Sequence, residues 1–474
     1  MSNFNNSGAR PAGADPPAAF SNAFERRSPR GLSAEEAVNQ LLQRTAKAGV
    51  HLGLTQITQL LARLGDPHQA VPIVHVAGTN GKGSVCAYLS SALTQAGYCV
   101  GRYTSPHLVS WTERICINEE PIASEVLLEL LHKVTETAAT HDLAPTQFEL
   151  ITAVAWLHFA QQRVDIAVME VGLGGRLDAT NICDRPLATA ITSIGRDHWQ
   201  RLGPTLAHIA GEKAGILKPG VPAVVGPVPE EAAAVITQRS QTVGCPLIWV
   251  SSAVACPGPL SPKTPQKDPQ RNWAEFLPPS SAFSSLTYPL GLLGTHQYAN
   301  SAVAIALLQL LQAQGWAIPT KAIQAGLGQA QWPARLQWTR WRGMPLLIDG
   351  AHNADAACAL RHYIDQAHSA ATPTAWVMGM LSTKDHREIL TILLRPGDRV
   401  CFVPVPGHQT AAPQDLLALA HQVCPQLCAT TATDGFQGLD WASSDPSSQA
   451  SPLVLCGSLY LIGHMVSQRG QQLV

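Results

Sequence analysis

Short runs of apolar residues, each followed by a polar or glycine-rich loop, recur along the chain. Residues 71–77, 164–171 and 187–194 are rich in Val, Ile and Ala, with few polar interruptions. Such nearly continuous apolar runs are typical of strands in a parallel sheet that is covered on both faces. Residues 85–96, which follow the first run and a glycine-rich loop, have the pattern of a helix. The order strand, glycine-rich loop, helix predicts an α/β nucleotide-binding domain.

A second alternation of strands and helices begins after Trp332-Pro-Ala-Arg335, which we interpret as a hinge. It predicts a second, smaller α/β domain with its own sheet. We therefore expect two domains, over residues 33–334 and 335–474. In the second domain, strands are expected at 346–348, 375–378, 400–403 and 453–455, and helices at 354–366 and 411–423.

Two segments differ in composition from these domains. Residues 1–32 are rich in Ala, Pro, Asn, Ser and Gly and are expected to form a disordered tail. Ser33 and Glu36 then form a capping-box pattern at the start of the first expected helix. Residues 251–289 are rich in Pro, Ser, Lys and Gln, and we interpret them as an insertion at the surface of the first domain.

Composition narrows the possible functions. The chain has 32 Lys and Arg residues against 33 Asp and Glu, so its formal net charge is −1. A protein that grips a nucleic-acid backbone normally has an excess of basic residues, so nucleic acid is not an expected partner. No run reaches the ~18 apolar residues of a membrane span, and the N-terminus lacks a secretory pattern. Eleven scattered cysteines are typical of reduced thiols. We expect a cytoplasmic protein with no membrane partner.

The glycine-rich loop carries the first candidate chemistry. Its sequence is Gly78-Thr-Asn-Gly-Lys-Gly-Ser84. Glycines let backbone N–H groups turn toward phosphate oxygens, and the following helix contributes the positive end of its dipole. Lys82 can reach the outer phosphates of a nucleotide, and the Ser84 hydroxyl can bind Mg²⁺. The spacing is shorter than in the general G-x-x-x-x-G-K-[ST] pattern, because Gly83 separates the lysine from the serine.

Acidic and imidazole side chains follow two further expected strands. Glu170 ends a buried apolar run, where a carboxylate is costly unless it meets a cation or hydrogen-bond donors. P-loop proteins place a magnesium-binding acid at such a position, and a satisfied structural acid is the alternative. Asp197-His198 follows the run at 187–194. Because ligands bind at the carboxyl ends of parallel strands, this pair is expected at the same crevice, as a metal or phosphate contact or in a structural role.

A series of motifs along the chain resembles one known family. Together they are similar to the folylpolyglutamate synthase and dihydrofolate synthase family of the Mur-ligase superfamily, over about residues 51–459. The motifs are, in order, Gly78-Thr-Asn-Gly-Lys-Gly-Ser84, Tyr103-Thr-Ser-Pro-His107, Glu170-Val-Gly-Leu-Gly-Gly-Arg-Leu-Asp-Ala-Thr-Asn181, Asp197-His198, Glu212-Lys-Ala-Gly-Ile216, His296-Gln297 with Asn300, and Asp349-Gly-Ala-His-Asn353.

The resemblance implies a two-domain Mur-ligase-like α/β fold, with a P-loop ATPase domain built on a mostly parallel sheet and a smaller Rossmann-like C-terminal domain. It implies a monomeric ligase that uses ATP and two Mg²⁺ ions to join L-glutamate to a pteroate or folate carboxylate through an acyl phosphate. The substrates would be dihydropteroate, which becomes dihydrofolate, and tetrahydrofolates, whose polyglutamate chain is extended.

The family also implies a role for each matching residue. Lys82, His198 and Lys213 would be catalytic. Lys213 would ligate metal as a carbamate, because an unmodified ammonium group has no lone pair to offer. The implied ATP contacts are Thr79, Asn80, Gly81, Lys82, Gly83, Ser84, Asn300, Arg335 and Asp349, and the implied metal ligands are Ser84, Ser105, Glu170, His198 and Lys213. The implied substrate contacts are Phe148, Glu149, Leu177, Asp178 and Ala179 for the pterin side, and His352 and Ser458 for the incoming glutamate.

Two other functions fit parts of the sequence. A ligase of the cell-wall branch, acting on another carboxylate, would need a separate N-terminal domain for the UDP-sugar, and about 45 ordered residues before Gly78 are too few for it. A non-catalytic ATP-binding module would be expected to have lost metal ligands, whereas Ser84, Glu170 and His198 are all present.

Overall fold

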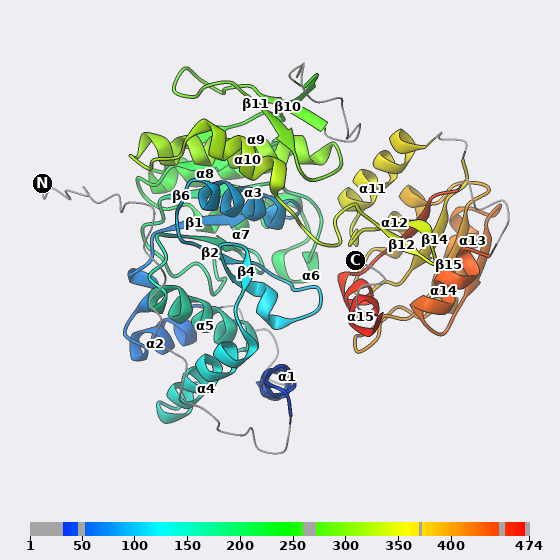
Figure 1. The fold of residues 1–474 in the computed structure, drawn as a ribbon, viewed down its shortest axis with the longest axis horizontal. Coiled ribbons are helices and arrows are strands. Elements are labelled where there is room, and N and C mark those ends of the chain that lie inside the picture. The colour runs from blue at the N-terminus through cyan, green and yellow to red at the C-terminus, as the bar shows by residue number, and fades with distance from the viewer. Residues whose placement is uncertain (1–31, 46–52, 259–271, 369–371, 445–450, 470–474) are drawn as a thin grey trace, which may run out of the picture.

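The computed structural model describes residues 32–45, 53–258, 272–368, 372–444 and 451–469. The tail expected at 1–32 lies outside these ranges except for its last residue. Two bodies of unequal size stand side by side, joined through the segment that contains Arg335 (Figure 1). Across the described ranges, every helix is too short or too polar to cross a membrane.

An eight-stranded sheet forms the centre of the first domain, in the order β4-β3-β2-β5-β1-β6-β7-β8. The neighbouring strands β2, β5, β1, β6, β7 and β8 pair in parallel, whereas β3 is antiparallel to β2 and to β4. Their bounds are β1 (Ile73–Ala77), β2 (Val100–Tyr103), β3 (Ile115–Ile117), β4 (Glu120–Pro121), β5 (Ile166–Glu170), β6 (Ala188–Ile191), β7 (Ala223–Val225) and β8 (Leu247–Trp249).

Helices cover both faces of this sheet, as Figure 1 shows above and below the strands. Val74 and Val76 of β1 enter the core on one face, and Ile73 enters the core on the other, as the twofold alternation of a strand requires. The first face packs on α3 (Lys82–Gln95), α9 (His296–Ala313) and α10 (Thr320–Gln329), and the second on α1 (Ala34–Thr45), α2 (Thr55–Arg63), α4 (Ser124–Thr140) and α5 (Gln147–Gln161). Beyond them lie α6 (Trp199–Leu202), α7 (Leu206–Lys213) and α8 (Glu230–Val243), with single turns at Pro67–Gln69, Trp111–Arg114 and Ala214–Ile216.

The segment 251–289 differs from the expected surface insertion. It contributes to an antiparallel sheet of β9 (Val254–Cys256), β10 (Asn272–Phe276) and β11 (Leu286–Leu290), while 259–271 lie outside the described residues. Ala274, Phe276 and Tyr288 are fully buried in the same core as α9 and α10. The polar composition hid this role, because only alternate residues of β10 point inward.

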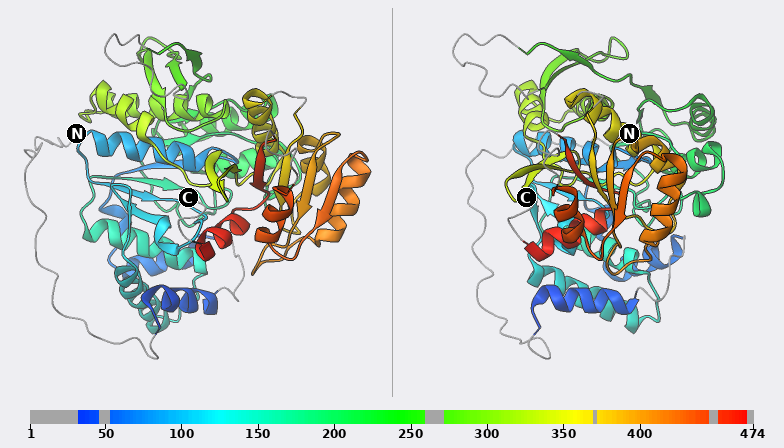
Figure 2. Two further views of the ribbon diagram at one scale, coloured as in Figure 1. Left: turned by 45° about the vertical axis from the view of Figure 1, so that its right-hand side comes forward. Right: turned by 90° about the vertical axis from the view of Figure 1, so that its right-hand side faces the viewer.

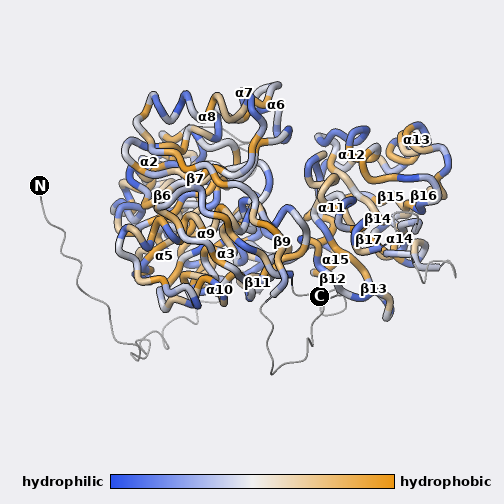
Figure 3. Tube along the Cα trace, turned by 90° about the horizontal axis from the view of Figure 1, so that it is seen from above, coloured by the Kyte–Doolittle hydropathy of each residue, from blue (hydrophilic) through white to orange (hydrophobic). Residues whose placement is uncertain are grey.

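The second domain has a six-stranded sheet in the order β12-β13-β17-β14-β15-β16, parallel except for β12. Its two faces pack on helices, and apolar segments run through both domains (Figure 3). The strands are β12 (Gln337–Trp341), β13 (Met344–Ile348), β14 (Ala375–Met378), β15 (Arg399–Phe402), β16 (Cys428–Thr431) and β17 (Leu453–Cys456). The helices are α11 (Ala354–Ala367), α12 (His386–Leu393), α13 (Pro413–Val423), α14 (Gly435–Ala442) and α15 (Leu459–Arg469). The expected two-domain α/β fold is confirmed.

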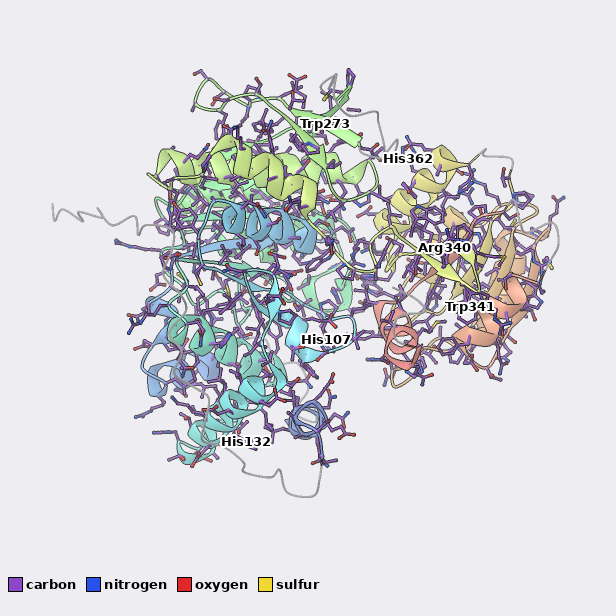
Figure 4. All side chains as sticks on the ribbon, viewed as in Figure 1. His107, His132, Trp273, Arg340, Trp341 and His362 are labelled. Atoms are coloured by element: carbon purple, nitrogen blue, oxygen red, sulfur yellow. The ribbon has the colours of Figure 1, made fainter. Side chains whose placement is uncertain are left out.

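The domains touch where the loop after β2 meets α15. Leu108, in that loop, packs against the core of the second domain, beside α15. Gly463 of α15 lies so close that a methyl group on its Cα would overlap the carbonyl oxygen of Leu108. Figure 2 shows α15 reaching toward the first domain, and in Figure 4 His107, next to Leu108, lies on the side nearest α15. A glycine here allows the two backbones to approach closely.

We predict that Gly463→Ala lowers turnover without lowering the stability of the second domain. Alanine favours a helix interior by about 1 kcal/mol over glycine, so the fold should gain, whereas the docked position of Leu108 would be blocked. We expect kcat to fall roughly tenfold or more, the effect of about 1.4 kcal/mol of lost alignment. Steady-state kinetics and thermal unfolding measure the two effects. Ser467→Ala, on the exposed side of α15, is the matched control, and a wild-type kcat in Gly463→Ala would contradict the prediction.

Candidate functional site

A cavity of about 880 Å³ lies between the two domains, at the carboxyl ends of the central strands. The loops that follow β1, β5 and β6 line it from the first domain, and the loop after β13 lines it from the second. Of the residues singled out in the sequence, those that line it are Thr79, Asn80, Gly81, Lys82, Gly83, Ser84, Ser105, Glu170, His198, Lys213, Asn300, Arg335, Asp349 and His352.

The glycine-rich loop bends sharply before α3. Gly78 and Gly81 both have positive φ, of 154° and 85°, which glycine adopts without strain. A side chain at Gly81 would overlap Asn300, and one at Gly83 would approach Trp332 to within 2.5 Å. Side chains of neighbouring elements thus pack against the loop. The first N–H groups of α3 have no acceptor within their own helix, so they can bind an anion.

Thr79 and Asn80 are held differently from the other loop residues. The Thr79 N–H donates to the carbonyl oxygen of Ser193 at 2.8 Å, and the Asn80 N–H donates to the Ser193 hydroxyl at 3.0 Å. The Asn80 carbonyl accepts from the hydroxyls of Thr192 and Ser193. These backbone groups therefore anchor the loop to the end of β6 and are not free for phosphate.

Two lysines and one glutamate surround the start of this loop. Lys82 Nζ donates to the carbonyl oxygens of Gly78 and Thr79, each at 3.1 Å, and lies 4.0 Å from Glu170 Oε1. Glu170 is 3% exposed, and its other oxygen accepts the Ser105 N–H at 3.2 Å. Burial raises the pKa of Glu170, although Lys82 opposes the shift. The carboxylate is only partly neutralised, so it can accept a further cation.

Lys213 reaches the same carbonyl from the end of α7. Its side chain is buried, and Nζ donates to the oxygen of Gly78 at 2.7 Å. Burial, followed by repulsion from Lys82, lowers the pKa of Lys213 to about 7. A substantial fraction of Lys213 is therefore an uncharged amine at neutral pH, which is the nucleophilic form of a lysine.

Asp197 and His198 lie at the mouth of the cavity, toward the second domain. His198 has a left-handed backbone, with φ of 52°, and about half of its side chain is exposed. Asp197 accepts from Lys384 Nζ at 2.7 Å and lies 3.4 Å from His352 Nε2. Burial by itself would raise the pKa of Asp197, but His352, His198 and Lys384 together lower it. The Asp197 carboxylate is thus ionised and joins the two domains.

A polar chain connects the phosphate loop to α9. Gln297 Nε2 donates to the Ser84 hydroxyl at 3.2 Å, and its amide oxygen accepts from Asn300 Nδ2 at 3.0 Å. Gln297 and Asn300 are both buried. The fixed amide of Gln297 thus orients the Ser84 hydroxyl and its lone pairs, as a ligand to a cation requires.

The expected hinge has a strained backbone that Asp349 supports. Ala334 and Leu336, on either side of Arg335, have positive φ of 57° and 44°. Non-glycine residues rarely adopt this conformation. Asp349 accepts from the N–H groups of Leu336 and Ala351, each at 2.8 Å, and Gln337 accepts from the Ala334 N–H at 2.8 Å. Arg335 is thereby presented to the cavity. Burial lowers the pKa of Arg335, although the charges of Asp349 and Glu170 oppose the shift.

A second cavity, of about 400 Å³, opens from the first. Gly172, Leu173, Asp197, His198 and His352 line both. Its further lining includes the cations Arg196, Arg201 and Lys384. The sequence reasoning missed Lys384 because a lysine in a polar loop is ordinarily a solvated surface residue. Its position after β14, at the same sheet edge as His352, was the available signal.

Several expected substrate contacts lie away from both cavities. Glu149 is buried as the capping-box acid of α5, and accepts the Thr146 N–H at 2.7 Å. Asp178 is buried and accepts from Leu173 N and from Thr180. The Ser458 hydroxyl accepts the Tyr460 N–H at 3.2 Å at the start of α15. Phe148 packs under Gly172, so it touches the cavity wall from behind. Leu177 and Ala179 are likewise absent from the cavity linings described here.

The donor set fits a hard cation such as Mg²⁺. Within the described ranges, His, Cys, Asp and Glu side chains do not gather in a group of three or more that could hold a metal by themselves. An ion beside Glu170 would therefore need hydroxyl and phosphate oxygens to complete its shell. Mg²⁺ is usually held in this way, by one or two carboxylates together with substrate phosphates.

Two family models match this chain. The Mur ligase middle domain matches residues 76–308, and the dihydrofolate synthetase C-terminal domain matches residues 334–468.

Named relatives extend this similarity. The dihydrofolate synthase/folylpolyglutamate synthase of Bacillus subtilis is 38% identical over 333 residues, which is 68% of this chain and 74% of that protein. The dihydrofolate synthetase of Saccharomyces cerevisiae is 34% identical over 437 residues, 88% of this chain and 97% of that protein. A solved structure of a bifunctional folylpolyglutamate synthase/dihydrofolate synthase with Mn, AMPPNP and L-glutamate bound has a TM-score of 0.77 and 29% identity, over 92% of this chain and 99% of that one.

We predict that Glu170→Gln lowers the apparent affinity for magnesium during turnover and leaves the fold intact. The substitution keeps the shape and removes the one buried carboxylate beside Lys82, so the Mg²⁺ concentration for half-maximal turnover should rise and excess Mg²⁺ should partly restore activity. A magnesium titration of initial rates measures this. Glu212→Gln, which removes a carboxylate paired with Arg176 outside the cavity, is the control. An unchanged magnesium dependence in Glu170→Gln would assign Glu170 a structural role.

Proposed function

Because the chain belongs to the dihydrofolate synthase and folylpolyglutamate synthase family, we infer that it is an ATP-dependent ligase that joins L-glutamate to a pteroate or folate carboxylate. The observation that carries this inference is the convergence of Lys82, Lys213 and Glu170 on the glycine-rich loop at the edge of the parallel sheet. Dihydropteroate would yield dihydrofolate, and tetrahydrofolates would gain further glutamates.

We propose that the nucleotide lies along the glycine-rich loop. The N–H groups at the start of α3 and the Lys82 ammonium would contact its phosphates. Arg335 and Asn300, which both line the cavity, would hold the rest of the molecule with Asp349. Asp349 would act chiefly through the hinge, since two backbone N–H groups already occupy its carboxylate.

Ser84, Ser105, Glu170 and His198 would bind the metal. When bound, Mg²⁺ would neutralise phosphate charge while two anions approach each other. The chain itself contributes the buried Glu170 carboxylate, the Ser84 hydroxyl oriented by Gln297, and the exposed His198 imidazole at the cavity mouth.

The proposed reaction has two steps. The substrate carboxylate attacks the γ-phosphorus, forms a C–O–P link and releases ADP. The unprotonated amine of glutamate then attacks the acyl carbon, an amide bond forms, and inorganic phosphate leaves as the amine loses a proton. Both steps need aligned reactants and little water, because hydrolysis would destroy the acyl phosphate. A cavity between two domains suits this requirement.

We propose that the amino acid enters through the second cavity. His352 lines both cavities, and Lys384 and Arg196 offer positive charge for the carboxylates of glutamate. Ser458 would contribute only through α15, given its bond to the Tyr460 N–H. On the opposite side, Phe148 and the loop of Leu177, Asp178 and Ala179 would shape the pterin pocket, with Glu149 and Asp178 holding the backbone of that wall.

The proposal also covers the setting in which the enzyme works. All eleven cysteines are free thiols, which supports a reducing compartment such as the cytoplasm. We propose that the enzyme acts as a monomer, as the resemblance of its motifs to the family implies. We assign ATP binding to residues 33–334 and amino-acid binding to residues 335–474.

We predict ATP- and glutamate-dependent phosphate release with dihydropteroate, with tetrahydrofolate, or with both. Coupled phosphate detection, with mass spectrometry of the product, measures this for the two substrates side by side. Lys82→Ala should reduce the rate by roughly a hundredfold or more, since it removes the ammonium group proposed to contact the outer phosphates. Release that needs neither pterin substrate, or a Lys82→Ala variant with wild-type rate, would refute the assignment.

We further predict that Lys213 is carbamylated. Carbamate formation needs the neutral amine, and with a pKa of about 7 roughly half of Lys213 is neutral at pH 7 and roughly a tenth at pH 6. Carbamate forms when the neutral amine attacks dissolved CO2 and loses a proton. After removal of CO2 and bicarbonate, recovery of activity at a fixed concentration of dissolved CO2 should therefore be about fivefold slower at pH 6 than at pH 7. Carbon-13 NMR with labelled bicarbonate should show a carbamate signal that Lys213→Met lacks. A signal retained in Lys213→Met, or recovery that is faster at pH 6, would contradict the prediction.

A further inference from the structure

Two asparagines from different domains form a reciprocal amide pair. Asn353 Nδ2 donates to Asn80 Oδ1 at 3.0 Å, and Asn80 Nδ2 donates to Asn353 Oδ1 at 3.3 Å. Asn80 belongs to the glycine-rich loop, whereas Asn353 precedes α11 in the second domain. Asn353 is 5% exposed, and Asn80 is partly buried. The pair connects the phosphate loop directly to the second domain.

Both ends of this pair are anchored by further bonds. Asn353 Oδ1 accepts the Ala356 N–H at 2.9 Å as the N-cap of α11, and its Nδ2 also lies 3.2 Å from Asp197 Oδ2. The backbone of Asn80 is fixed to Thr192 and Ser193 at the end of β6. The pair therefore joins the N-terminus of α11 to the end of β6 through rigid elements.

A close approach between the backbone of Gly195 and the side chain of Asp355 reinforces this contact. A methyl group on Gly195 would overlap the carboxylate of Asp355, in the first turn of α11. Lys384 and His352 approach Asp197 from the second domain, and Gln200 Nε2 donates to the carbonyl oxygen of Thr383 at 3.1 Å. The start of α11 thus sits on the loop after β6 with little room to shift.

The geometry points to a role for Asn80 other than phosphate binding. Its N–H, its carbonyl and its side chain all have partners within the protein. We propose that Asn353 is a positioning residue for the ligase reaction, which acts through Asn80 to set the second domain in register with the phosphate loop. The proposal rests on the proposed function, in that the aligned groups are the phosphate loop and the amino-acid side of the cavity.

Asn353→Ser separates this role from helix capping. Serine is as good an N-cap as asparagine, so α11 should remain capped, while the amide that reaches Asn80 and Asp197 is lost. We expect kcat to fall about tenfold, and the dissociation constant for ADP to change less than about twofold. The kcat of Asn353→Asp should fall further, because aspartate keeps the helix cap and places a second carboxylate beside Asp197.

A double-mutant cycle tests whether Asn353 acts through Asn80. Asn80→Ser alone should lower kcat to a similar extent without weakening ADP binding, and the double variant should be little worse than either single one. Small-angle scattering of the full chain with ADP reports domain separation whatever the reaction is. The radius of gyration should rise in Asn353→Ser, so failure of this proposal can be told apart from failure of the proposed function.

Asp434→Ala is the matched control. Asp434 caps α14 of the same domain by accepting the Phe436 and Gln437 N–H groups at 2.8 and 2.9 Å, and it does not line either cavity. Loss of the Asp434 side chain should lower the melting temperature by a few degrees and leave kcat unchanged. The proposal is overturned if Asn353→Ser keeps wild-type kcat and radius of gyration, if kcat and ADP affinity fall together, or if the Asn80 and Asn353 effects simply multiply.

Discussion

Two lysine ammonium groups from different helices donate to one carbonyl oxygen, that of Gly78. Burial disfavours the charged form of Lys213, and repulsion from Lys82 adds to this cost, which is why the pKa of Lys213 lies near neutrality. The Glu170 carboxylate, 4.0 Å from Lys82 Nζ, partly offsets the positive charge beside the loop. A phosphate group would relieve this excess, and a metal would complete the charge balance at Glu170. The affinity for a nucleotide therefore follows from charges that the fold holds together at the edge of a sheet.

A second constraint is that groups from the two domains must lie in closely defined positions relative to each other. Asp197 is the meeting point, since Asn353, His352 and Lys384 all approach it from the other domain. The hinge that connects the domains is itself fixed, because Asp349 and Gln337 bind the N–H groups of its two positive-φ residues. Such conformations cost of order 1–3 kcal/mol each and persist only where neighbouring bonds over-determine them. Chemistry between the domains thus depends on hydrogen bonds that never touch a substrate.

Local patterns predicted most of the fold. Strands 73–77, 166–170 and 188–191 lie within the apolar runs, and the loop at Gly78 precedes a helix as expected. The strands within 251–289 were not predicted, because strands with one buried face need only alternate apolar residues. Glu149 and Asp178 fitted the resemblance to a substrate pocket but are occupied by Thr146 and by Leu173 and Thr180. A motif identifies a neighbourhood and leaves open the direction in which each side chain points.

The sequence by itself determined which chemistry was available: a phosphate loop with its lysine, an acid after a buried strand, and a histidine in a loop at the same edge. The alternation of these residues with apolar runs was enough to locate them, because hydrophobic periodicity and turn residues are features of a few neighbouring positions. Only the tertiary structure decided that Lys213 is buried against Gly78, that Lys384 lines the second cavity, and that the Asn80 side chain binds Asn353. These contacts join residues more than a hundred positions apart, and burial and charge proximity, which set their pKa values and partners, arise only when the sheets and domains are packed.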